Sequence, residues 1–462
     1  MTDQAEDSTQ SSEVDVSAGP ALAPITESKR IAAMDILRGF ALIGILLMNI
    51  EWFGRSILEL GTFDETLTGF DHAVGWLIRC FVEGKFYKLF ALLFGMGFAV
   101  MLLRARERGK PFGAWFTRRM LVLFVIGMLH MVFLWGGDIL HDYAIAGLVF
   151  LGFILLLGKK RFRKYDNPKS YLKIALIWLS LPIAIGAIAG LGFGPYFSHE
   201  DLTNRWEQEK QVVSLVAIKM EEAADIEAND AQLPDDDPGE EEQSEPTENA
   251  ALDTEQEEQE LSEEEELQLL VAEVFEQKLE TEGDKEEELE ALTQGSYWDA
   301  TRYRFFHALS ALKVTPALTF MMLLPIFLLG FWFVSSGVIR DHHNNAHIFR
   351  PMALIGLSLG LVFTVSGLLV IQQPVIEQSM LLLATGQILF YLGQFVLCAG
   401  YLGTLITLLR SPKWAQRLSV LAPMGRMALT NYIAHSVILT SLFYGYAGGL
   451  YGQVSRAPQM LI

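Results

Sequence analysis

Hydrophobic residues along this chain gather in nine long runs that are separated by more polar stretches. With approximate ends, the runs lie at 33–53, 84–103, 117–135, 138–158, 172–194, 313–338, 350–371, 380–409 and 424–447. A helix needs about 20 mostly apolar residues to cross roughly 30 Å of hydrocarbon. No stretch alternates apolar and polar residues as the strands of a membrane barrel do. The pattern therefore predicts an all-α, polytopic helical membrane protein with about nine transmembrane helices.

Lys and Arg are concentrated in alternate connections between these runs. Six, seven and four basic residues, respectively, lie in the connections 104–119, 159–173 and 410–426. The connections 136–138 and 372–378 have none, and the one between the first two runs is sparse, with Arg55 and Arg79. Because cytoplasmic connections retain Lys and Arg, the N-terminus is expected in the cytoplasm.

The net charge of −20 comes from one acidic segment. Between Glu221 and Glu290 there are 31 acidic residues and two lysines, a charge of −29, so the remaining residues sum to +9. The chain is thus a basic, apolar membrane body with an acidic insert, and its low isoelectric point does not identify a partner. A segment this acidic and poor in apolar residues is typical of a solvated spacer.

Composition divides the chain into four parts. Residues 1–30 are expected to form a disordered cytoplasmic tail, because the first 28 are acidic and rich in Ser, Thr and Ala. They lack the basic start of a signal peptide. Residues 31–195 are expected to form an N-terminal transmembrane bundle of five helices. Residues 196–300 form the acidic, partly disordered extracytoplasmic insert, and 301–462 form a C-terminal transmembrane domain of four helices. With only two cysteines, no disulfide framework or cysteine-based metal site is expected.

Ionisable residues at membrane depth are the first candidates for chemistry, because each is costly to place there. The sequence predicts two such layers. The inner layer contains Asp35, Arg38, Arg426, Thr430, Asn431 and Tyr432. The outer layer contains Lys85, Lys88, His130, Asp138, His141 and Asp142. Each residue also has a structural explanation. Asp35 and Arg38 are spaced as a helical i,i+3 pair, Lys85 can extend to the membrane interface, and His130 can be a hydrogen-bonded packing residue.

Four motifs resemble one known family. They are RIAAMDILRGFALIGILLMNI at Arg30–Ile50, GKFYKLFALLFGMGF at Gly84–Phe98, GMLHMVFLWGGDILHDYAIAGL at Gly127–Leu148 and GRMALTNYIAHSVILTSLFY at Gly425–Tyr444. The first three look like the YeiB family of bacterial inner-membrane proteins, and the last is similar to that family's C-terminal domain of unknown function 418. The resemblance covers nearly all of the chain apart from the tail and the insert. It implies a bacterial inner (plasma) membrane location.

The resemblance also implies an activity. The family fold is similar to that of transmembrane acyltransferases, including the lysosomal heparan-α-glucosaminide N-acetyltransferase. The implied donor is cytosolic acyl-CoA, and the implied partner is a small-molecule or glycan acceptor at the outer side of the bilayer. At the inner mouth, Arg38 and Arg426 are expected to hold donor phosphates, with Asp35 and Asn431 beside them.

On the outer side, His130 is the implied general base that deprotonates the acceptor, and Asp138 orients it. Lys85 or Asn431 is expected to stabilise the developing oxyanion. His72 is a rival for the base, because the histidine proposed as catalytic in the N-acetyltransferase lies in the approach to the second span.

Two other functions fit the same residues. A transporter or channel for a small solute also lines a helical bundle with charged groups, and a non-catalytic scaffold would use the insert for docking. No metal site is expected from the histidines of the connection 340–350, and no nucleic-acid partner is expected. Family members continue into one more hydrophobic helix, so a tenth helix is expected to be missing from this chain. The oligomeric state stays open.

Overall fold

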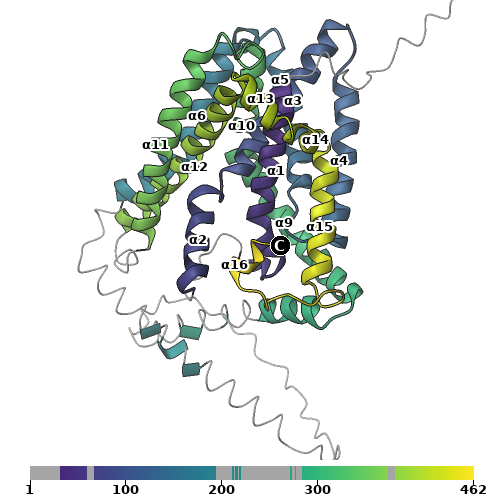
Figure 1. The fold of residues 1–462 in the computed structure, drawn as a ribbon, viewed down its shortest axis with the longest axis vertical. Helices are drawn as coiled ribbons and strands as arrows, with labels where there is room; N and C mark the ends of the chain where they lie inside the picture. Colours follow the sequence, from purple (N-terminus) through teal and green to yellow (C-terminus); the bar gives the residue numbers. More distant parts are fainter. Residues whose placement is uncertain are drawn as a thin grey trace, which may run out of the picture.

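The computed structural model describes residues 32–59, 67–193, 283–372 and 380–462, with scattered positions between 211 and 276. These residues form helices and their connections, with no strand among them, so the predicted all-α class is confirmed (Figure 1). The expected tail, 1–30, and most of the expected insert, 196–300, lie outside the described residues.

Fourteen labelled α-helices can be followed in this described part of the chain. They are α1 (Ala32–Phe53), α2 (Gly69–Phe81), α3 (Phe86–Glu107), α4 (Gly113–Phe133), α5 (Leu140–Leu157), α6 (Pro168–Ala187), α9 (Tyr297–Leu318), α10 (Leu324–Ser335), α11 (Ala346–Ile371), α12 (Met380–Leu409), α13 (Pro412–Leu418), α14 (Leu421–Arg426), α15 (Ala428–Phe443) and α16 (Arg456–Gln459). The π-helical stretch Ile188–Phe193 continues α6, and Thr319–Leu323 joins α9 to α10. A further helix covers 283–293.

Eight helical stretches among the described residues are long and apolar enough to cross a membrane. The ninth predicted run is shorter than expected, because it forms the 16-residue helix α15. Helix α14 ends at Arg426, Met427 departs from helical geometry, and Tyr444 is extended with a ψ of 144°. The second predicted run is α3, which the separate helix α2 precedes. The polytopic architecture is therefore confirmed, as eight long helices and one short one.

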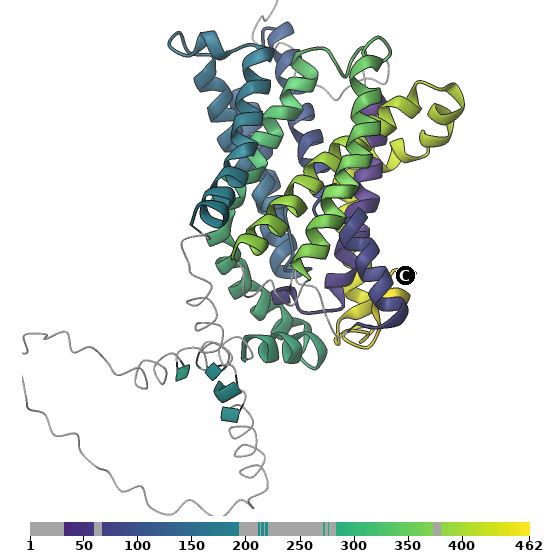
Figure 2. The same ribbon diagram turned by 90° about the vertical axis from the view of Figure 1, so that its left-hand side faces the viewer.

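Glycines allow the helices at the centre of the bundle to touch through their backbones. A Cβ on Gly95 of α3 would overlap the backbone of Phe327 in α10, and one on Gly330 of α10 would overlap Leu92 of α3. Gly356 and Gly360 of α11 face α12 in the same way, as their spacing in the sequence suggests. Figure 2 shows the inclined α11–α12 pair beside the rest of the bundle.

The C-terminal segment closes one end of the bundle, which we call the α16 end (Figure 1). Arg456 of α16 forms a buried ion pair with Glu51 near the end of α1. Gln459 Nε2 donates to Ile50 O at 2.6 Å, and Ala457 N donates to Asp71 Oδ1 of α2 at 2.6 Å. These contacts fix the ends of α1 and α2 against the last residues of the chain.

Candidate functional site

The turn between α4 and α5 carries the central carboxylate of the site. Asp138 Oδ2 accepts hydrogen bonds from Leu140 N at 2.8 Å and His141 N at 3.2 Å, at the N-terminus of α5. This turn lies so close to α4 that a Cβ on Gly127 would come within 2.6 Å of His141 N. Gly127 is one helical turn before His130. The close approach therefore places Asp138 beside the imidazole.

His130 has a polar partner at each ring nitrogen. Its Nε2 lies 2.7 Å from Ser436 Oγ of α15, and its Nδ1 lies 3.0 Å from Asp138 Oδ1. The second contact departs from the straight geometry of a hydrogen bond, so it is best described as a close charge contact. The three residues are between 2% and 6% exposed. A hydroxyl, an imidazole and a carboxylate thus lie in sequence inside the bundle, an order that general-base sites share.

The same carboxylate links His130 to a second histidine. His141 Nδ1 lies 3.3 Å from Asp138 Oδ2, and the opposite nitrogen lies 3.3 Å from Thr315 Oγ1 of α9. Tyr432 of α15 donates its hydroxyl to Asp138 Oδ1 at 3.4 Å. The N-terminus of α5 and these donors favour the ionised form of Asp138. An ionised Asp138 stabilises a positive charge on His130.

Lys85 and Lys88 form a different buried cluster, at the connection between α2 and α3. Lys85 Nζ donates to Arg79 O at 2.6 Å. Lys88 Nζ donates to Gly84 O, Tyr87 Oη and Gln394 Oε1 at 2.9, 2.9 and 2.5 Å. Gly84 has a φ of +76°, and a Cβ there would overlap the Gln394 amide. Lys85 thus accounts for a carbonyl at the end of α2, whereas the contacts of His130 are with Ser436, Asp138 and Tyr432.

The predicted inner residues gather where α14 crosses α1. Arg38 Nη1 donates to Asp35 Oδ1 at 3.1 Å, so the i,i+3 pair is present. A Cβ on Gly425 would overlap the backbone of Asp35, which brings the neighbouring Arg426 to the same end of α1. Asn431 Nδ2 donates to Met424 O at 3.0 Å and so fastens α15 to α14.

His72, the rival base, lies half-buried on α2. Helix α2 packs against α16 and α11, whereas His130 lies between α4 and α15. The structure therefore keeps the two histidines in different parts of the bundle. Among the described residues, no group of three or more His, Cys, Asp or Glu side chains is arranged to hold a metal ion.

Ser436 and Thr315 join the site although the sequence did not point to them, and Tyr432, expected in the inner layer, contacts Asp138 of the outer layer. Ser436 lies 306 positions from His130 and Thr315 lies 174 from His141. A single signal was available: Tyr432 and Ser436 are four residues apart and so share a face of α15, with Thr440 one turn further. Hydroxyl residues on an otherwise apolar helix are common, which makes this signal weak.

Comparison with known proteins shows which family this chain resembles. Residues 333–462 match the family described as "Protein of unknown function (DUF418)". The chain is 24% identical over 450 residues to the uncharacterized protein YxaH of Bacillus subtilis, an alignment that spans 96% of this chain and 88% of the relative. It is 33% identical over 123 residues to the uncharacterized protein YeiB of Escherichia coli, across 26% of this chain and 30% of YeiB. The chain is YeiB-like and carries a C-terminal DUF418 domain.

A third relative supports the same placement. An uncharacterized 39.9 kDa protein of Bacillus acidopullulyticus is 36% identical over 183 residues, which cover 39% of this chain and 49% of the relative. No solved structure matches the YeiB-like chain. The DUF418 match contains Ser436 and Tyr432, whereas His130 and Asp138 lie before it. The site is thus built across the boundary of the matched domain.

Proposed function

We propose that this YeiB-like protein is a membrane-embedded acyltransferase, which moves an acyl group from cytosolic acyl-CoA to an acceptor at the outer side of the membrane. The observation that carries the proposal is the buried set of Ser436, His130 and Asp138. Its imidazole is 2.7 Å from a hydroxyl on one side and 3.0 Å from a carboxylate on the other. A histidine held in this way suits proton transfer to and from a reacting group.

In the proposed reaction the acceptor hydroxyl or amine takes the place of Ser436 Oγ at His130 Nε2. His130 removes the acceptor proton as the acceptor oxygen or nitrogen attacks the thioester carbonyl. The carbon–sulfur bond then breaks, and the protonated imidazole returns its proton to the departing thiolate of CoA. Asp138 stabilises the imidazolium between these two steps, as a carboxylate does in other histidine-based acyl transfer sites.

The donor is proposed to enter at the end of the bundle where α1 begins. There Arg38 and Arg426 are placed by α1 and α14, and guanidinium groups suit the phosphates of CoA. The basic connections 104–119 and 159–173 support an orientation with this end in the cytoplasm of a bacterial inner membrane. A membrane-impermeant maleimide should label Gln453→Cys, but not Lys164→Cys, in intact cells. The reverse result would contradict this orientation.

Thiol release from acetyl-CoA and palmitoyl-CoA by the purified full chain tests the activity. We expect His130→Ala to lower the rate by about 100-fold or more, in line with the usual contribution of a general base. His72→Ala should retain the wild-type rate. Loss of turnover in His72→Ala, with His130→Ala still active, would identify His72 of α2 as the base. The absence of thiol release and of acyl-CoA binding by the wild type would reject the acyltransferase.

One observation favours a transporter as the second candidate. Asp138 contacts both His130 and His141, which gives a linked set of ionisable side chains within the bundle, as in proton-coupled transporters. In proteoliposomes, such a protein would move protons in a manner that requires Asp138, without releasing thiol from acyl-CoA. An acyltransferase would instead release thiol from acyl-CoA and move no protons.

A further inference from the structure

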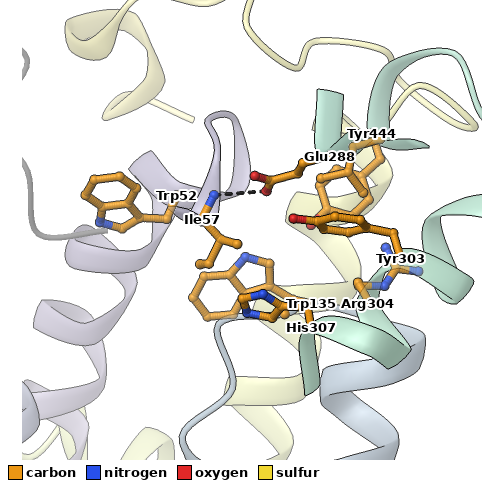
Figure 3. Close-up of a pocket in the computed structure, with 10 residues that line it drawn as sticks. Trp52, Ile57, Trp135, Glu288, Tyr303, Arg304, His307 and Tyr444 are labelled. Atoms are coloured by element: carbon orange, nitrogen blue, oxygen red, sulfur yellow. Dashed lines mark hydrogen bonds between the residues drawn. The ribbon is translucent and has the colours of Figure 1, made fainter. Parts of the chain in front are cut away.

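A small cavity lies at the α16 end of the bundle, beside the turn that carries Asp138 (Figure 3). It is lined by Trp52, Ile57, Trp135, Gly136, Glu288, Leu292, Tyr303, Arg304, His307 and Tyr444. Trp135 and Gly136 stand three and two residues before Asp138. A ligand in this cavity therefore lies next to the proposed site of acyl transfer. The cavity has room for about one water molecule.

Arg304 of α9 is the cation of this cavity, and it is only 2% exposed. Its Nε donates to Val132 O at 2.9 Å, and Nη2 lies 3.3 Å from Thr301 Oγ1. The rings of Tyr297 and Tyr444 lie 5.9 and 5.6 Å from the guanidinium carbon. Within the described part of the chain, no carboxylate forms an ion pair with Arg304, and Nη1 makes no hydrogen bond.

A buried guanidinium without an anionic partner is costly, because burial removes water that would otherwise solvate the charge. The bond to Val132 O explains one part of its placement, since cations stabilise the C-terminus of a helix such as α4. It does not explain the unused Nη1. Buried polar groups that lack a partner commonly mark the place of a ligand or a water molecule.

We propose that Arg304 binds the phosphate of a polyhydroxylated acceptor, which the cavity presents to His130. Guanidinium groups pair well with phosphate oxygens. Tyr303, His307 and Glu288 supply hydrogen-bonding groups for hydroxyls, and Trp135 supplies an aromatic face (Figure 3). The inference rests on the proposed acyltransferase, because it names the class of acceptor used at that site. The phosphate belongs either to a soluble ester or to a lipid headgroup.

The helix at 283–293 forms one wall of the cavity and has to move for a phosphate to enter. Glu288 accepts a hydrogen bond from Ile57 N at 2.9 Å and a short one from the Ser56 hydroxyl. Gly445 N donates to Leu292 O at 2.7 Å. Leu292 also packs in the hydrophobic cluster at this end. We expect the wall to open by breaking these contacts without unfolding the transmembrane helices.

Binding by the full-length protein tests the proposal without reference to turnover. The soluble probe is sn-glycerol 3-phosphate, with glycerol as the neutral comparison. The lipid probe is a nanodisc of phosphatidylglycerol in phosphatidylcholine, read by native mass spectrometry. We expect the wild type to bind at least one phosphate probe and not glycerol. Arg304→Met should weaken that binding by at least tenfold, and Arg304→Lys should recover part of it. Arg302→Met, two residues away and exposed, is the matched control and should bind as the wild type does.

The results separate this inference from the acyltransferase itself. If the wild type binds neither phosphate probe, or if Arg304→Met binds as well as Arg302→Met, the inference is wrong even where thiol release from acyl-CoA is present. If phosphate binding depends on Arg304 but no variant, including the wild type, releases thiol, the binding site stands and the acyltransferase is rejected. In an active enzyme, Arg304→Lys should raise the KM for the phosphate acceptor and leave the KM for acyl-CoA unchanged.

Discussion

Replacing Gly127 by alanine tests how closely α4 meets the turn that carries Asp138. The added Cβ would lie 2.6 Å from His141 N and 3.0 Å from Asp138 Oδ2. Ordinary van der Waals contact begins at 3.4 Å, so the turn has to move by roughly 0.8 Å to restore a normal contact with the backbone nitrogen. Overpacking of this kind costs about 1–3 kcal/mol.

The same shift should act on the chemistry. Asp138 would move with the turn, while His130 stays on α4. A displacement of about 1 Å in a catalytic arrangement can cost roughly 100-fold in rate. We therefore expect Gly127→Ala to lower both the thermal midpoint of the protein in detergent and the rate of acyl transfer.

Gly152→Ala on α5 is the matched control for this substitution. Gly152 is also helical, but a Cβ there would meet nothing within 4 Å. Alanine is favoured over glycine inside a helix by roughly 0.5–1 kcal/mol, so this variant should be at least as stable as the wild type. Thermal unfolding, followed by tryptophan fluorescence, compares the midpoints of the two variants. Equal midpoints and equal transfer rates for both would refute the close packing of α4 on the turn.

Two further predictions concern the α16 end. Arg456→Met should destabilise the protein by up to about 3–5 kcal/mol, because the buried Glu51 loses its pair with Arg456 and keeps the one with the more exposed Arg55. Glu51→Leu combined with Arg456→Met should recover part of the loss. Additive losses in denaturant unfolding would contradict this. Burial raises the pKa of Glu288 above its ordinary 4.5, although hydrogen bonds from Ser56 and Ile57 oppose the rise. The Glu288 carboxyl therefore holds its proton more tightly when the helix at 283–293 packs over the cavity than when that helix is detached. The packing of this helix is strongest below pH 4.5 and weakens as the pH rises through the raised pKa. The rate of cleavage after Lys285 by a lysine-specific protease should rise with pH more steeply in the wild type than in Glu288→Gln. The same pH dependence in both proteins would contradict a role for Glu288 in holding this helix.

The helices and the local pairs could be predicted from the sequence because their causes are local. Run length alone identifies membrane helices, and the Asp35–Arg38 pair follows from helical spacing. His130 and Asp138 are eight residues apart across a Gly-Gly turn, so their meeting also depends on a short segment. These parts of the site needed no knowledge of the tertiary fold.

The partners from distant segments could not be predicted, because only packing brings them together. Ser436 meets His130 across 306 positions, and Gln394 meets Lys88 across the same separation. A serine on α15 or a glutamine on α12 carries no periodic signal of its partner. Packing also determines the contacts of the two expected oxyanion donors. Lys85 Nζ donates to Arg79 O, and Asn431 Nδ2 donates to Met424 O.

Lys88 and Arg304, two of the buried cations among the described residues, differ in a way that decides where a ligand is expected. An ammonium has three N–H donors, and Lys88 directs them at three oxygens, those of Gly84, Tyr87 and Gln394. Lys88 is therefore saturated by the protein and needs no further acceptor. A guanidinium has five N–H donors. Arg304 directs Nε and Nη2 at oxygens of Val132 and Thr301, whereas Nη1 has no hydrogen-bond partner. The unsatisfied cation lies in the cavity beside the turn of Asp138, which is why a phosphate is proposed there rather than at the lysines.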